Sequence, residues 1–169
     1  ITKEMIDAEV ERLAALPRPA NGVRASRIVH PASQTATGFA PGTDVTIHVL
    51  RPGETSVARR GNAGQVEISL RGGGSIDVDR GLTVAQHDVW TLPPMRSYAH
   101  RNPGKDLWVR LTYSNAPLLE MLGALFEEQG DAIGRAESLD DGLSERHPGA
   151  SQQHAADREC EQRIAGDDR

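Results

Sequence analysis

The sequence lacks most of the features that mark secreted or membrane-spanning proteins. It contains one cysteine, Cys160, so no internal disulfide can form, and we expect a reducing, cytoplasmic location. No apolar run approaches the roughly 20 residues that cross a bilayer, and the first residues carry no signal-peptide pattern. We therefore expect no membrane partner.

An excess of basic charge is also missing. The formal net charge is −5 and the pI is about 5.7. Residues 131–169 hold ten acidic residues and five arginines, whereas the rest of the chain holds fourteen of each sign. Because no basic stripe is available to meet phosphates, we expect no nucleic-acid partner.

What the sequence does contain is a series of short apolar and β-branched segments separated by Gly, Pro and Asn turns. Regular spacing of this kind is typical of an all-β sandwich or barrel. A helical pattern precedes the series, capped by Thr2, and a second one follows it, starting at Pro117 and stopping at Gly130. The expected strands are 23–29, 45–50, 65–70, 75–78, 89–92 and 107–113, and the expected helices are 2–16 and 117–129.

These elements divide the chain into four expected parts. Residues 1–27 form an N-terminal helix with a lead-in loop, and residues 28–116 form the β-barrel. Residues 117–130 form a packing helix with Leu118, Leu122 and Leu125 on one face. Residues 131–169 form an acidic polar tail or linker.

Four motifs occur in order along the β region: Arg51-Pro52-Gly53-Glu54, Gly72-Gly73-Gly74, the stretch 88–94 ending in Pro93-Pro94, and the stretch 111–123. Together they resemble the cupin superfamily, most closely the gentisate 1,2-dioxygenase-like bicupins, over residues 28–127. The resemblance implies an all-β fold, a cupin jelly-roll β-barrel with flanking N- and C-terminal helices.

The resemblance also implies a family that opens aromatic rings with O₂ at a ferrous centre. Its ligands are a His-x-His pair, a Glu or Gln, and a later His. Here those positions read Arg59, Gly61, Gln65 and Tyr98. A permanent cation, a missing side chain and a protonated phenol make poor Fe(II) ligands. We expect no metal cofactor, with Fe held by displaced residues such as His48, Gln65 and His100 as the alternative.

The same region predicts a pocket at the barrel mouth. Arg59 is either a clamp for a carboxylate or part of an exposed turn, and Gln65 either binds a ligand or satisfies a buried neighbour. Tyr98 and His100 share strand parity and face the interior, as an acid–base pair or as packing residues. His48 alternates with the apolar residues of its strand and lines the pocket if those residues pack outward.

Three functions remain open at this point. In a gentisate-dioxygenase-like bicupin one half is often metal-free, so the chain is a non-catalytic support or oligomerisation domain, partnered by a second copy or a second cupin half. Alternatively, it is a metal-independent protein or enzyme that binds a small anionic organic molecule. The third reading is an Fe(II)-dependent dioxygenase with displaced ligands.

Overall fold

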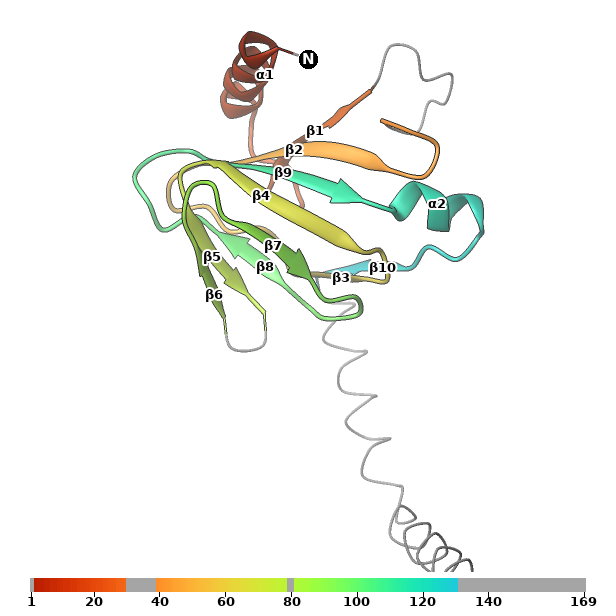
Figure 1. Cartoon of the computed structure of the whole chain (residues 1–169). Helices are drawn as coiled ribbons and strands as arrows, with labels where there is room; N and C mark the ends of the chain where they lie inside the picture. The colour runs from red at the N-terminus through yellow and green to blue at the C-terminus, as the bar shows by residue number, and fades with distance from the viewer. Residues whose placement is uncertain (1, 30–38, 79–80, 131–169) are drawn as a thin grey trace, which may run out of the picture. The chain divides into compact units, whose positions relative to one another are not determined.

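The computed structural model describes residues 2–29, 39–78 and 81–130. The expected tail at 131–169, with Cys160, lies outside these residues. Two antiparallel β layers and two helices make up the described part (Figure 1). The elements are α1 (Lys3–Ala15), β1 (Arg24–Ile28), β2 (Asp44–Leu50), β3 (Arg59–Gly61), β4 (Gln65–Arg71), β5 (Gly74–Asp77), β6 (Leu82–Val84), β7 (Val89–Leu92), β8 (Ala99–Arg101), β9 (Trp108–Ser114), α2 (Ala116–Met121) and β10 (Glu127–Gln129).

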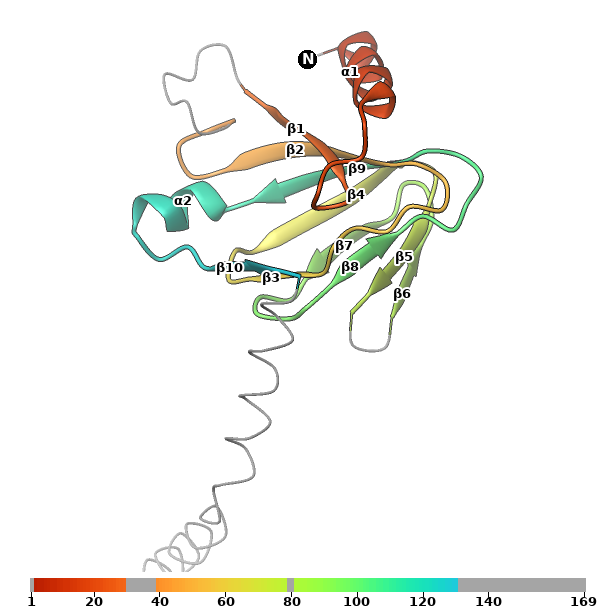
Figure 2. The ribbon, with the colours of Figure 1, turned by 180° about the vertical axis from the view of Figure 1, so that it is seen from behind.

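The larger layer is a five-stranded sheet in the order β1-β2-β9-β4-β7. The opposite layer consists of a three-stranded sheet, β6-β5-β8, and the pair β10-β3, which a bridge between Arg59 and Tyr98 connects. Figures 1 and 2 show α1 on one side of the large sheet and the shorter strands on the other. The interior between the two layers therefore holds both the core and the candidate site.

Strand alternation separates the two faces of the large sheet. The inward-facing Trp90 and Trp108 lie in one core cluster with Tyr98, and their ring centroids are 6.4 Å apart. Both tryptophans are therefore packing residues of the core. Gly74 makes this packing possible, because a Cβ there would lie 2.3 Å from the Trp108 ring.

The outward face of β2 packs against the N-terminal helix. Thr2 caps α1 as expected, and Val10 and Leu13 contact Ile47 and Val49 in a second apolar cluster. The guanidinium of Arg51 donates to backbone carbonyls in the last turn of α1, so the first motif anchors the helix to the barrel. Within the described residues, no helix is long and apolar enough to cross a membrane.

The second helix is much shorter than predicted. α2 ends at Met121, and Leu118 and Leu122 are 42% and 69% exposed, so the predicted packing face is wrong. Gly123 adopts a φ of +65°, a conformation that ends the helix. The side chain of Asn62 then donates to Ala124 O and accepts from Phe126 N, which directs the chain into β10.

Candidate functional site

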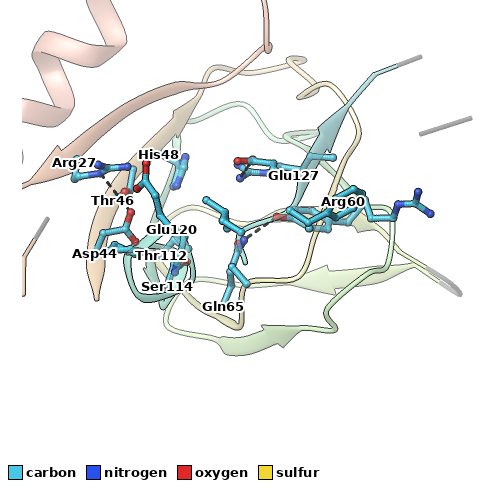
Figure 3. A pocket seen from close by; sticks show the side chains of 18 residues that line it. Arg27, Asp44, Thr46, His48, Arg60, Gln65, Thr112, Ser114, Glu120 and Glu127 are labelled. Atoms are coloured by element: carbon cyan, nitrogen blue, oxygen red, sulfur yellow. Dashed lines mark hydrogen bonds and ion pairs between the residues drawn. The ribbon is translucent and has the colours of Figure 1, made fainter. Parts of the chain in front are cut away.

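A cavity of about 240 Å³ opens between the two layers, beside α2 (Figure 3). All four positions that the resemblance implies as metal ligands line it. Figure 3 places Asp44, Thr46 and His48 on one side and Arg60 and Glu127 on the other. The positions that the sequence singled out therefore do converge, and His48 shares their cavity.

The wall from β2 and β9 consists of inward-facing polar side chains: Asp44, Thr46, His48, Thr112 and Ser114. The apolar residues between them face α1 or the outer surface, so the expected orientation of His48 is confirmed. Among the described residues, no group hydrogen-bonds to its buried Nδ1. Burial, together with the nearby Arg110 charge, holds the pKa of His48 well below its usual range. This imidazole is therefore neutral.

The opposite wall is built around Arg59 and Tyr98. Their backbones exchange two hydrogen bonds of 2.9 and 3.0 Å, and the guanidinium carbon lies 5.9 Å from the tyrosine ring centroid. The Tyr98 hydroxyl donates to Gln65 Oε1 at 3.2 Å. Burial raises the pKa of Tyr98, which keeps the phenol protonated. Because Arg59 lies in strand β3, the exposed-turn interpretation of this residue is wrong.

Strand β10 occupies the space in front of Gly61. Glu127 pairs with Gly61 across the two strands, and a Cβ on this glycine would lie 3.0 Å from Phe126 O. A side chain at this position would require Phe126 O to move by a few tenths of an ångström. Glycine therefore suits the close approach of β10 to β3.

Beneath the cavity lies a buried polar network centred on Glu67. Its carboxylate accepts from Arg110 Nη1 at 2.9 Å to each oxygen, and from Thr112 Oγ1 at 3.2 Å. His100 Nε2 lies 2.8 Å from the second oxygen. Although burial alone would raise it, Arg110 and His100 hold the pKa of Glu67 well below its usual range. The glutamate is therefore ionised.

His100 belongs to this network rather than to the larger cavity. It lines a small neighbouring cavity of about 20 Å³, together with Glu67 and Arg110. Burial, and then the charge of Arg110, lower its pKa to about 4. A neutral His100 donates a hydrogen bond from its Nε2–H to Glu67. Arg110 already balances the charge of that carboxylate. The Tyr98 and His100 rings meet edge to face at 5.4 Å, but the predicted acid–base role of the pair stays a prediction.

Sequence reasoning missed the importance of Glu67 and Arg110. One signal was available: polar residues at every second position of 65–69 and 110–114 predict two inward polar rows. Only the pairing of β4 with β9 shows that these rows lie side by side on one face of the sheet.

The donor set does not fit a ferrous ion. Arg59 is cationic and faces Glu127, Gly61 has no side chain, and Tyr98 stays protonated, which leaves one amide oxygen from Gln65. Of the displaced set, Gln65 lines only the larger of the two cavities and His100 only the smaller. Within the described ranges, no group of three His, Cys, Asp or Glu side chains is arranged to hold a metal.

No family model and no curated protein matches this sequence. Solved structures do match. The salicylate 1,2-dioxygenase of Pseudoaminobacter salicylatoxidans, in a structure of its adducts with gentisate, aligns with a TM-score of 0.67 at 18% identity, over 78% of this chain and 37% of that one. A cupin 2 conserved barrel domain protein from Salinispora arenicola aligns with a TM-score of 0.51 at 21% identity, over 65% and 89%.

This chain has the cupin fold. The expected all-β jelly-roll with flanking helices is confirmed, and so is the resemblance to gentisate-dioxygenase-like bicupins at the level of the fold. The cupin domain spans 37% of the length of the salicylate dioxygenase that it matches.

Proposed function

We propose that this cupin domain binds a small organic anion without a metal, in the cavity at the former metal-ligand positions. The observation that carries the proposal is that the cavity stays open. A cavity of about 240 Å³ lies just below the roughly 300–1,000 Å³ usual for ligand sites, so a single-ring acid is the size class it suits.

Each wall offers a distinct contact to such a ligand. Arg59 presents a planar guanidinium that suits a carboxylate, and the protonated Tyr98 hydroxyl can exchange its 3.2 Å hydrogen bond to Gln65 Oε1 for one to the ligand. His48 brings a neutral imidazole whose Nδ1 has no hydrogen-bond partner in the described part of the chain. Together these groups suit a ring that carries a carboxylate and a hydroxyl. Salicylate and gentisate are probes of this chemistry, and gentisate is the ligand named for the matching dioxygenase structure.

The test is calorimetric titration of the full chain with salicylate and gentisate in chelator-treated buffer, with salicylamide as the uncharged control. We expect saturable binding of the acids and weaker binding of the amide. Arg59→Gln and Tyr98→Phe should each weaken binding of the acids, by about tenfold for the loss of one charged contact. Binding that appears only after iron is added would reject the proposal.

A second candidate function, assembly with another copy of this chain, rests on the outer face of the large sheet. Beyond the part that α1 covers, the register of β4 and β9 places Val66 beside Tyr113 and Ile68 beside Leu111. On the other side of β4, Val89 of β7 lies beside Ile68. Tyr113, Val66 and Val89 are exposed, although aromatic and aliphatic side chains of this kind usually lie in an interior or an interface. This apolar strip is the surface that would support a second cupin domain.

Two matched variants test the assembly. Val66 and Leu82 are each 39% exposed, but Leu82 lies on β6 in the other layer. Sedimentation of the full chain should give an oligomer for the wild type and for Leu82→Glu, and a monomer for Val66→Glu. A monomeric wild-type chain would reject this function.

A further inference from the structure

The cavity already contains a carboxylate at the place where the proposed ligand would need one. Glu127 lines the cavity, and its Oε1 lies 2.5 Å from Arg59 Nη2. We infer that Glu127 is an internal competitor: it occupies the guanidinium of Arg59, and a ligand carboxylate binds by displacing it. This inference rests on the function proposed above. It adds that competition with Glu127 selects the class of ligand.

The contact between Arg59 and Glu127 has the features of an exchangeable pair. The two side chains are 30% and 41% exposed, and exposed ion pairs contribute little to stability, about 0–1 kcal/mol. Only one hydrogen bond joins the side chains, although a guanidinium can offer two parallel donors to a carboxylate. A ligand that makes both bonds would have the advantage over Glu127.

The neighbouring pair on the same two strands is built differently. Arg60 donates to Glu128 Oε2 from Nε at 3.2 Å and from Nη2 at 2.7 Å, and these side chains are 10% and 23% exposed. Glu128 pairs directly with Arg60 in the backbone register, whereas Glu127 lies opposite Gly61 and reaches past it. We therefore assign Glu128 to holding β10 in place and Glu127 to the cavity.

The arrangement predicts a specific ligand preference. A neutral molecule gains nothing from Arg59 while Glu127 stays in place, whereas a carboxylate that replaces Glu127 leaves the charge of Arg59 balanced. The displaced Glu127, already partly exposed, can turn to solvent. The site therefore suits small monocarboxylates. Their apparent affinity equals the intrinsic affinity multiplied by the fraction of time in which Glu127 leaves Arg59 free.

The test compares Glu127→Gln with Glu128→Gln in the full chain, by titration with salicylate and salicylamide. Glu127→Gln should tighten salicylate about two- to fivefold, which equals about 0.4–1 kcal/mol at 1.4 kcal/mol per tenfold. It should leave salicylamide unchanged, and Glu128→Gln should leave both probes unchanged. In the Arg59→Gln background, the effect of Glu127→Gln on salicylate should vanish, because the competed group is gone.

The outcomes separate the inference from the function on which it rests. Equal salicylate affinity in the wild type and Glu127→Gln overturns the inference and leaves the binding function standing. Equal tightening by Glu127→Gln and Glu128→Gln also overturns it, since loosening of β10 would then be the cause. If neither the wild type nor Glu127→Gln binds salicylate, both fail.

Discussion

Two arginine–carboxylate pairs lie in the same barrel interior and differ in almost every physical respect. Arg110 and Glu67 are 2% and 3% exposed at the side chain, and His100 and Thr112 satisfy the same carboxylate. Arg59 and Glu127 lie at the mouth, and their side chains are 30% and 41% exposed. Separation of the first pair would leave a buried charge without a partner, whereas water can solvate either partner of the second pair.

The difference originates in the strands that carry the pairs. Glu67 and Arg110 lie on β4 and β9, two neighbouring seven-residue strands within the large sheet. Arg59 and Glu127 lie on β3 and β10, a two-stranded pair of three residues each. The pair on the long central strands is therefore buried, whereas the pair on the short strands is partly exposed beside the cavity.

Breaking the deep pair should have the largest effect. Glu67→Gln leaves Arg110 buried without a full counter-charge, and loss of one partner of a buried ion pair costs about 3–5 kcal/mol. Urea denaturation, followed by tryptophan fluorescence, should show this loss in the free energy of unfolding. A loss below about 1 kcal/mol would mean that water reaches the network and that the two pairs do not differ in kind.

Acid should weaken the deep network. The pKa of His100 is lowered to about 4 in the folded protein, against about 6.5 for an ordinary histidine. Between these values the unfolded chain binds the extra proton, so stability falls as pH falls from about 6.5 to 4, by on the order of 3 kcal/mol. His48 and Glu67, whose pKa values are also lowered, act in the same direction.

Denaturation midpoints measured between pH 7.5 and 4 test this dependence. The midpoint should be nearly constant above about pH 6.5 and should fall as pH falls from 6.5 to 4, and this fall should shrink in His100→Gln. A flat profile down to pH 5 would contradict the neutral state assigned to His100.

The long strands were predictable from the sequence, but the contacts that make the site were not. Short apolar and β-branched runs between turn residues identified 45–50, 65–70 and 107–113, and the matching strands β2, β4 and β9, at seven residues each, are long enough to show a period. The strands β3, β6, β8 and β10, each three residues long, leave no such periodicity. The partners of Glu67 lie 33 to 45 residues away on β8 and β9, so only the strand pairing reveals the network.

The second helix shows the same limit. Leu118, Leu122 and Leu125 have helical spacing, which predicted a packing face. Asn62, more than sixty residues away, ties the backbone of Ala124 and Phe126 to the β3 side and converts the end of the pattern into β10. A long-range contact between a side chain and the backbone therefore overrides local periodicity here. It produces the cavity wall that carries Glu127.

A smaller effect is expected where β10 crosses the former ligand position. In Gly61→Ala the new Cβ would lie 3.0 Å from Phe126 O, which must give by a few tenths of an ångström, and we expect a cost of about 1 kcal/mol. Gly64→Ala is the control, since its nearest neighbour is 3.8 Å away. Equal stability of the two variants in urea would show that β10 yields freely and that glycine is not required beside it.

The smallest effect on stability should come from the pair at the mouth. Glu127→Gln removes an exposed ion pair and should change the free energy of unfolding by less than about 1 kcal/mol. The contrast with Glu67→Gln matters more than either value, because both substitutions remove one carboxylate charge from an arginine in the same barrel. A loss at Glu127 as large as that at Glu67 would mean that the mouth is structural as well. Carboxylate exchange at Arg59 would then have to overcome a contact that the fold needs.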